Sequence, residues 1–326
     1  MEVEIKKSLS KMSNEELAAR IHDLKIAKNA VILAHYYQVP EIQELADFVG
    51  DSLQLSQKAA ETEADIIVFA GVHFMAETAK ILNPNKKVLI PDMNAGCSLA
   101  DSCPPEQFKP FIEAHPGHKV VSYINCSAAV KTMSDVICTS SNAKAVVDSF
   151  PVDQPLIFAP DRNLGAYINS ITGRNMVLWD GACHVHNQLT DERTIKLKID
   201  NPDAKLIAHP ECRGPILALA DFIGSTAALL EFTKKDSNRK YIVATEGGII
   251  HQMKKANPQK EFLVVPSDET CNCNDCPFMK LNSLEKIYLS LKNEQPEIII
   301  DPETISLAAK PILRMLEISK QTGLVK

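Results

Sequence analysis

The sequence lacks any run of about eighteen consecutive apolar residues, the length that a helix needs to cross a bilayer. It also lacks a cluster of Lys and Arg, and its net charge is −6, so we expect neither nucleic acid nor a membrane as a partner. The amino-terminal segment, MEVEIKKSLSKMSNEEL, has no apolar stretch of the kind found in signal peptides. These absences predict a soluble protein of the cytoplasm.

No G-x-G-x-x-G or P-loop motif is present, which argues against a conventional nucleotide-binding enzyme. Cysteine, in contrast, is plentiful, with nine in the chain. In the cytoplasm, thiols are more often buried, catalytic or metal-bound than paired in disulfides. Four cysteines lie in strand-like or small-residue sequence and are expected to be core residues: Cys103, Cys126, Cys138 and Cys212. The other five are candidates for a metal site.

Short apolar runs alternate with stretches of helical periodicity along the chain. Nine of these runs have the length and the β-branched composition of buried strands. They are residues 31–37, 65–71, 87–92, 119–125, 155–161, 175–181, 205–211, 240–247 and 261–268. Buried strands separated by helices of about 10–15 residues are typical of parallel sheets covered on both faces. The sequence therefore predicts an α/β protein built from Rossmann-like layers.

One sequence pattern occurs three times. His35, Tyr123 and His209, spaced 88 and 86 residues apart, each follow two apolar residues and a small one. Twelve residues after each of them stands an aspartate, which we interpret as a structural residue at the start of the next strand. The three aspartates are Asp47, Asp135 and Asp221. Agreement at about ten positions without gaps predicts three α/β repeats.

Each repeat places polar residues where its first strand ends, which is where ligands bind in open parallel sheets. These residues are His35 and Tyr37, Tyr123 and Asn125, and His209 and Glu211. Around a pseudo-threefold axis, the three strand ends would converge on one central cavity. Hydroxyl groups that could bind carboxylate or phosphate stand where the next strand meets its helix. They belong to Ser52, Ser140 and Thr226.

Each repeat also ends with a cysteine in the turn after a further strand: Cys97, Cys183 and Cys276. Three converging thiolates predict a zinc ion or an iron–sulfur cluster. A structural zinc ion needs four ligands, whereas a cubane held by three cysteines keeps one iron open as a Lewis acid. Soft thiolates without neighbouring His and carboxylate ligands favour the cluster. The alternative is a local zinc knuckle formed by Cys271, Cys273 and Cys276.

Seven segments make the chain similar to the quinolinate synthases. They are AHYYQVPEIQELADFVGDS, PDMNAGCSLADSC, YINCSAAVK, WDGACHVH, HPEC, ATEGGIIHQ and CPFMKLNSLEKIYLSL. The resemblance implies three Rossmann-like α/β/α domains with parallel sheets, related by pseudo-threefold symmetry around a central active site. It also implies one [4Fe–4S] cluster per chain, with one cysteine ligand from each domain.

The activity implied by this resemblance is that of a transferase in de novo NAD biosynthesis. The enzyme condenses iminoaspartate with dihydroxyacetone phosphate to give quinolinate, phosphate and water, and the cluster serves as a Lewis acid for dehydration. L-Aspartate oxidase acts before it, so a transient contact with that enzyme is expected.

The resemblance assigns roles by position. Cys97, Cys183 and Cys276 match the cluster ligands. The substrate-binding positions are His35, Tyr37, Ser52, Tyr123, Ile124, Asn125, Ser140, His209, Pro210, Glu211 and Thr226. The residues expected to move protons are Glu211, His209, Tyr37 and His35. The residues expected to hold carboxylate and phosphate oxygens are Ser52, Ser140, Thr226 and Asn125.

The third cysteine departs from the family pattern. Many relatives have the spacing C-x-x-C-x-x-C before Pro-aromatic-Met, whereas here one residue separates Cys271 from Cys273. Cys276 is the expected ligand because a Pro-Phe-Met segment follows it, and Cys273 is the alternative. Two other residues have two interpretations each. His186 is a neighbour of the cluster or an ordinary loop histidine, and Glu246 touches substrate or caps the next helix.

The repeats set the expected domain boundaries. The first domain, with an amino-terminal helix, covers residues 1–115, the second covers 116–202 and the third covers 203–281. Residues 282–326 are expected to form helices that pack back on the first domain.

Overall fold

The computed structural model describes residues 12–267 and 274–325, and it is an α/β protein. It contains three four-stranded sheets in which all the paired strands are parallel. The predicted α/β class and the nine predicted strands are confirmed. Each sheet also has one further strand of two or three residues: β2 (Phe48–Gly50), β6 (Val136–Cys138) and β10 (Phe222–Ile223).

The three sheets have the same strand order. The first contains β1 (Ala30–His35), β3 (Ile66–Ala70) and β4 (Lys87–Leu89) in the order β2-β1-β3-β4. The second contains β5 (Lys119–Tyr123), β7 (Leu156–Ala159) and β8 (Val177–Leu178) in the order β6-β5-β7-β8. The third contains β9 (Lys205–Ala208), β11 (Lys240–Ala244) and β12 (Glu261–Val264) in the order β10-β9-β11-β12. The sequence repeat is therefore a repeat of topology.

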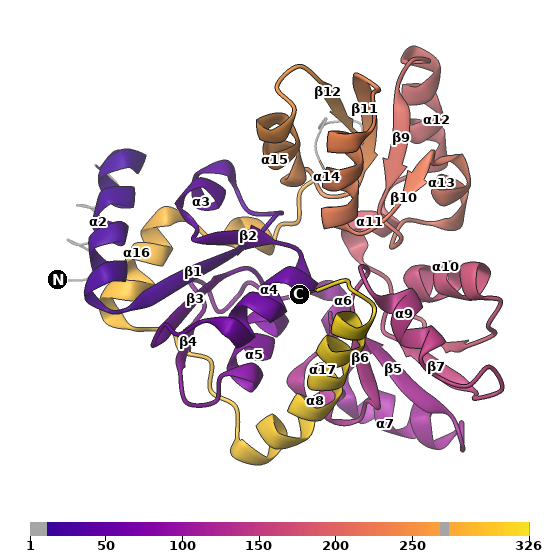
Figure 1. Ribbon diagram of the computed structural model, residues 1–326, viewed down its shortest axis with the longest axis horizontal. Coiled ribbons are helices and arrows are strands. Elements are labelled where there is room, and N and C mark those ends of the chain that lie inside the picture. Colours follow the sequence, from indigo (N-terminus) through magenta and orange to yellow (C-terminus); the bar gives the residue numbers. More distant parts are fainter. Residues whose placement is uncertain (1–11, 268–273, 326) are drawn as a thin grey trace. The chain divides into compact units, whose positions relative to one another are not determined.

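Helices connect the parallel strands and cover the sheets (Figure 1). Around the first sheet are α2 (Asn14–Ala27), α3 (Pro40–Leu45), α4 (Ser52–Glu61), α5 (His73–Leu82) and α16 (Leu284–Asn293). Helices α6 (Ser98–Asp101) and α7 (Pro105–Glu113) follow β4, and α8 (Ala128–Thr132), α9 (Ala143–Asp148) and α10 (Arg162–Thr172) connect the strands of the second sheet. Helices α11 (His184–Asn187) and α12 (Asp191–Asp200) follow β8, and α13 (Gly214–Leu219), α14 (Thr226–Lys235) and α15 (Ile249–Ala256) connect the strands of the third sheet. A 3₁₀ turn, η1 (Met279–Leu281), precedes α16, and α17 (Pro302–Gln321) follows it.

Side chains on alternate positions of a strand face opposite layers, and the first sheet follows this rule. Ile32 and Val68 pack in one buried cluster with Leu17 and Ile21 of α2 and Ile287 of α16. Each fully buried aliphatic side chain of this kind contributes about 1.5–3 kcal/mol to folding. The apolar faces of α2 and α16 are therefore buried against one side of the first sheet.

The repeated aspartates hold the start of each short strand to the first strand of its sheet. The carboxylate of Asp47 accepts the backbone N–H of Ile32 at 2.8 Å, and the Asp47 N–H returns a bond to the Ile32 carbonyl at 3.0 Å. Asp135 makes the same two contacts with Val120, and Asp221 makes them with Leu206. The structural interpretation of these three residues is confirmed.

The chain divides into two compact units. The first unit consists of Met1–Gly96 and Pro277–Ile305 and contains the first sheet. The second consists of Cys97–Cys276 and Ser306–Lys326 and contains the second and third sheets.

The two C-terminal helices have different neighbours. Helix α16 packs against α2. The part of α17 in the second unit instead contacts the second repeat, where Asn142 donates to the Ser319 hydroxyl at 2.8 Å and Arg314 lies over the Phe150 ring. That α17 packs back on the first domain stays a prediction. Its amphipathic pattern predicts a buried face but does not say which domain covers it.

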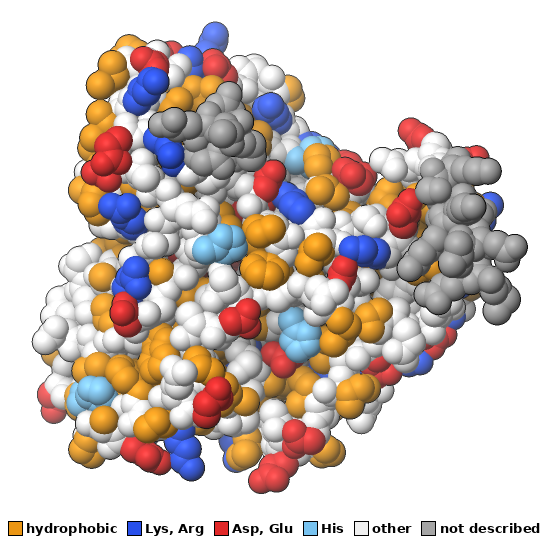
Figure 2. Space-filling view, turned by 180° about the vertical axis from the view of Figure 1, so that it is seen from behind, with side chains coloured by type: hydrophobic (Ala, Val, Ile, Leu, Met, Phe, Trp, Pro, Cys, Tyr) orange, Lys and Arg blue, Asp and Glu red, His pale blue; other side chains and the backbone are white. Residues whose placement is uncertain are grey.

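Among the described residues, no helix has both the length and the hydropathy needed to cross a membrane. Figure 2 shows acidic and basic side chains interspersed on the face in view.

Candidate functional site

The first and third repeats share one turn after their first strand. In the third repeat, His209 follows β9, and its ring Nδ1 accepts the backbone N–H of Glu211 at 3.4 Å. In the first repeat, His35 ends β1, and its Nδ1 accepts the N–H of Tyr37 at 3.1 Å. The turn thus fixes the direction of the residue two places after each histidine.

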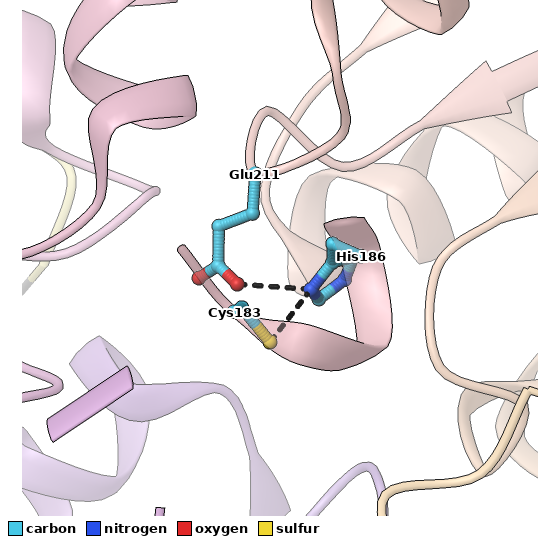
Figure 3. Close-up of side chains that lie close together, drawn as sticks. All are labelled: Cys183, His186 and Glu211. Carbon is cyan, nitrogen blue, oxygen red and sulfur yellow. Dashed lines mark hydrogen bonds and ion pairs between the residues drawn. The ribbon is translucent and has the colours of Figure 1, made fainter. Parts of the chain in front are cut away.

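The Glu211 carboxylate is buried and has a partner on each oxygen. The Tyr123 hydroxyl donates to Oε1. His186 Nδ1 lies 2.9 Å from Oε2 and 3.3 Å from the Cys183 sulfur. Figure 3 shows Glu211 and Cys183 pointing at the same nitrogen of the His186 ring. The ligand atoms of Cys183, His186 and Glu211 lie within 4.8 Å of one another, so these three residues could also bind a metal ion.

Further side chains of the second unit extend this arrangement. His186 Nε2 lies 2.9 Å from the Thr245 hydroxyl, and the His186 ring stacks on His209 at 4.8 Å between centroids. His209 Nε2 lies 3.1 Å from the Ser140 hydroxyl. We call the set Tyr123, Ser140, Cys183, His186, His209, Glu211 and Thr245 the Glu211 network. It joins residues of the second and third repeats.

The environment sets the charge of the two titratable groups at the centre of this network. Burial lowers the pKa of His209 to about 3, so its ring is neutral at neutral pH. Burial alone would raise the pKa of Glu211, but the contacts with His186, His209 and Tyr123 outweigh it and lower that pKa to about 2. Glu211 is therefore a carboxylate at neutral pH and can accept protons or cationic groups.

The described cysteines fall into two classes. Cys103, Cys126, Cys138 and Cys212 are fully buried, as expected for core residues. The expected ligands Cys97, Cys183 and Cys276 are partly exposed, and all three belong to the second unit. Cys271 and Cys273 lie outside the described residues, so the choice between Cys273 and Cys276 stays a prediction.

Of the three partly exposed cysteines, Cys97 lies within electrostatic reach of both Cys183 and Cys276. Burial, with smaller contributions from the nearby Cys276 and Glu211, raises the pKa of Cys97 to about 12. Burial also raises the pKa of Cys183, with added contributions from Glu211 and Cys97. Three thiolates so placed repel one another, and a bound cation relieves that repulsion.

Two buried carboxylates hold the backbone of two of these cysteines. Asp161 accepts the Cys183 N–H at 3.1 Å and the Leu164 N–H at 2.8 Å. Glu246 accepts the Cys276 N–H at 3.0 Å and the Gly248 N–H at 2.6 Å. Burial, reinforced by the charge of Glu211, raises the pKa of Asp161 to about 7. Gly248 is the N-cap residue of α15, which has no side-chain cap hydrogen bond, so Glu246 binds the residue before the helix and the structure does not support the capping interpretation.

The other predicted substrate residues of the second unit border the same strand ends. The Asn125 amide oxygen is buried and has no hydrogen-bond partner among the described protein atoms. Ile124 and Pro210 are buried, and the Ile124 N–H donates to the Cys138 carbonyl. Thr226 is the first residue of α14, directly after its cap Ser225. A buried amide oxygen without a protein partner is typical of a ligand site.

The predicted residues of the first unit have equivalent local positions. His35 and Tyr37 are buried and make an edge-to-face ring contact at 4.4 Å. Ser52 is the first residue of α4, whose cap is Asp51. Ser52 and Thr226 thus stand at equivalent helix starts, whereas Ser140 lies three residues before α9.

Sequence reasoning left out Asp161 and Thr245 and gave His186 no definite role. A signal for His186 was present in the spacing Cys183-x-x-His186, which on a helical turn brings two side chains together. Asp161 and Glu246 share a position two residues after the third strand of their repeats. The equivalence of these two positions can be recognised only when the strand registers of the second and third sheets are compared.

Comparison with known proteins agrees with this architecture. Residues 19–317 match the model of the family described as quinolinate synthetase A protein. A protein named quinolinate synthase from Trichodesmium erythraeum is 60% identical over 305 residues, covering 94% of each chain. Proteins of the same name from Nostoc sp. and Thermosynechococcus vestitus are 59% and 60% identical over 93% of this chain, and over 94% and 96% of their own lengths. The chain therefore belongs to the quinolinate synthase family of enzymes.

Proposed function

We propose that this chain condenses iminoaspartate with dihydroxyacetone phosphate to form quinolinate, releasing one phosphate and two waters. We further propose that one [4Fe–4S] cluster is held by Cys97, Cys183 and Cys276. The observation that carries the proposal is that Cys97 interacts with both Cys183 and Cys276, and that Cys183 lies against the buried pair of His186 and Glu211. L-Aspartate oxidase is the proposed source of iminoaspartate.

The donor set fits an iron–sulfur cluster. Three soft thiols, one after the fourth strand of each repeat, supply three ligands, and thiolate is the ligand that such clusters use. A cluster bound in this way would supply a Lewis acid for the loss of hydroxyl groups. The side chains around it would bind the substrates and move their protons.

Proton transfer is the proposed role of the Glu211 network. Glu211 is ionised at neutral pH, and the Tyr123 hydroxyl donates to it, so a proton taken from substrate carbon can be shared across this pair. Neutral His209 can accept a proton or orient a substrate through Ser140. His35 and Tyr37 are proposed to act in the same steps because they occupy the equivalent turn.

The carboxylate and phosphate groups of the substrates need hydrogen-bond donors. Thr226 and Ser52 begin helices, where hydroxyl and backbone N–H groups can bind carboxylate or phosphate. Asn125 and Ser140 add an amide and a hydroxyl at the end of the second sheet. Ile124 and Pro210 are proposed to line the site with their backbone and their apolar surface.

The test is anaerobic purification followed by metal, sulfide and product analysis. We expect brown protein with about four iron and four sulfide per chain, as a [4Fe–4S] cluster requires. This protein should form quinolinate from the two substrates. Absence of iron and sulfide from anaerobically reconstituted protein, or absence of quinolinate with the cluster present, would refute the corresponding part of the proposal.

One observation favours a second candidate, a zinc site. Cys183, His186 and Glu211 offer three ligand atoms within 4.8 Å, and zinc accepts sulfur, nitrogen and carboxylate ligands. The same analysis separates the two candidates: colourless protein with one zinc and no sulfide per chain would support the zinc site.

A further inference from the structure

Two carboxylates occupy equivalent positions in the second and third sheets. Strand register pairs Ser122 with Ala159 in the second sheet and Ala208 with Ala244 in the third. Ser122 and Ala208 directly precede Tyr123 and His209, which are equivalent in the repeat. Ala159 and Ala244 are therefore equivalent, and so are the residues two places after them. These are Asp161 and Glu246.

Both carboxylates divide their two oxygens in the same way. One oxygen of Asp161 accepts the N–H of Leu164 in the first turn of α10, and the other accepts the N–H of Cys183. One oxygen of Glu246 accepts the N–H of Gly248 at the start of α15, and the other accepts the N–H of Cys276. Both side chains are completely buried.

Helix capping alone does not explain a buried charge at these positions. In the same unit, the hydroxyl groups of Ser127 and Ser225 cap α8 and α14. A hydroxyl cap stabilises a helix about as well as a carboxylate and avoids the cost of burying a charge. What a carboxylate adds is a second acceptor oxygen, and here that oxygen binds a cysteine amide in each case.

We propose that Asp161 and Glu246 are positioning residues that hold Cys183 and Cys276 in the orientation needed to bind one metal centre together. The inference rests on the proposed function, since it requires a cluster at these cysteines. A hydrogen bond to a carboxylate is stronger than one between neutral groups and fixes the peptide plane of the cysteine. The direction of the cysteine side chain is then set before any metal binds.

The first repeat has no carboxylate at the equivalent position. Register pairs Ala34 with Ala70, and the residue two places after Ala70 is Val72, which offers no side-chain acceptor. The proposal therefore applies to Cys183 and Cys276 and makes no demand on Cys97.

The experiment uses the full chain with three single substitutions. Asp161→Ser keeps a capping hydroxyl for α10 but removes the oxygen that binds Cys183. Glu246→Gln keeps the size of the side chain and removes one of its two acceptors. Thr190→Ala is the matched control, because Thr190 caps α12 in the same unit by accepting the N–H of Arg193.

Two measurements are made on each protein. The first, before loading with metal, is hydrogen–deuterium exchange in the segments that contain residues 183 and 276. The second, after anaerobic loading with iron and sulfide, is the iron content and the rate at which a chelator removes the iron. We expect exchange at 183 in Asp161→Ser, and at 276 in Glu246→Gln, to be about tenfold faster, since a bond to a charged group is lost. Iron removal should be faster by a similar factor, and Thr190→Ala should match the unmodified chain in both measurements.

The outcomes separate this inference from the proposed function. If the unmodified chain takes up no iron and sulfide, the proposed function fails and this inference fails with it. If the unmodified chain loads normally and both variants load and retain iron equally well, this inference alone is overturned. Equal acceleration of iron removal in Thr190→Ala would also overturn it, because a general loss of stability would then explain the effect.

Discussion

The two edges of each sheet behave differently. At the amino ends of the short strands β2, β6 and β10, the three repeats carry the same residue, an aspartate, with the same pair of contacts to the first strand. At the carboxyl ends of the first strands, the repeats carry different pairs. The three pairs are His35 and Tyr37, Tyr123 and Asn125, and His209 and Glu211.

This difference separates the residues that maintain the fold from those available for chemistry. Identical contacts in three repeats are expected where every sheet must join a short strand to its first strand. Side chains can diverge where the turn only has to fix the direction of one residue, as the rings of His35 and His209 do for the residues two places later. Substitutions at the carboxyl ends should therefore affect metal binding and catalysis, and those at the amino ends should affect stability.

The largest effect is expected for the cysteines after the fourth strands. Cys97→Ser, Cys183→Ser and Cys276→Ser should each abolish stable cluster binding, because a cluster with three protein ligands has no spare thiolate. Iron and sulfide analysis after anaerobic reconstitution measures this loss. Serine at the four buried positions, Cys103, Cys126, Cys138 and Cys212, should leave the cluster content unchanged. Retention of the cluster in Cys276→Ser together with its loss in Cys273→Ser would move the third ligand to Cys273.

The next effect concerns Glu211, the one carboxylate at the three strand ends. Glu211→Gln keeps the shape and the bond from Tyr123 but removes the base, so the rate of quinolinate formation should fall by about 10² to 10⁴. The iron and sulfide content should stay normal, and single-turnover assays on loaded enzyme measure the rate. Near-normal turnover with a full cluster would mean that Glu211 only positions its neighbours.

The repeated aspartates at the amino ends should affect stability alone. Asp221→Ala leaves the Leu206 N–H without its side-chain acceptor, and the free energy of unfolding should fall by about 1–3 kcal/mol. Asp221→Asn keeps an oxygen that can accept this N–H, so the free energy of unfolding should fall by less. Urea unfolding measures both, and the activity per loaded chain should not change. A loss of activity at constant cluster content would contradict the division between the two sheet edges.

The smallest effect is a pH dependence at the amino edge of the first sheet. Glu294 bonds with Lys28 and with Lys87, which begins β4, and these contacts lower the pKa of Glu294 from 4.5 to about 2. A carboxyl whose folded pKa is depressed stabilises the fold above its unfolded pKa and loses that contribution as the pH falls toward the folded value. Glu294→Gln should therefore lower stability slightly at pH 7 and hardly at all near pH 2. Urea midpoints across this range test it, and a larger deficit at low pH than at neutral pH would reverse the sign.

Much of the fold was predictable because its signals are local. Apolar runs identified nine strands, and the spacing of His35, Tyr123 and His209 identified three repeats of one topology. The short strands such as β10 are missing from the nine apolar runs, because two residues carry too little periodicity, but the repeated aspartates indicated where each of these strands begins. The contact of α17 with the second repeat was not predicted, since an amphipathic helix does not specify its partner.

The sequence by itself determined which residue types stand at the strand ends and at the cysteine turns, because strand length and turn position follow from the local pattern. Tertiary structure alone decided which of them meet. His186 lies 25 residues from Glu211 and Thr245 lies 59 residues from His186, yet both contacts form within the second unit. The same holds for Asp161 and Glu246, which reach cysteine amides 22 and 30 residues away. Such contacts depend on strand register and on the packing of separate segments, and neither is encoded in the spacing of residues along the chain.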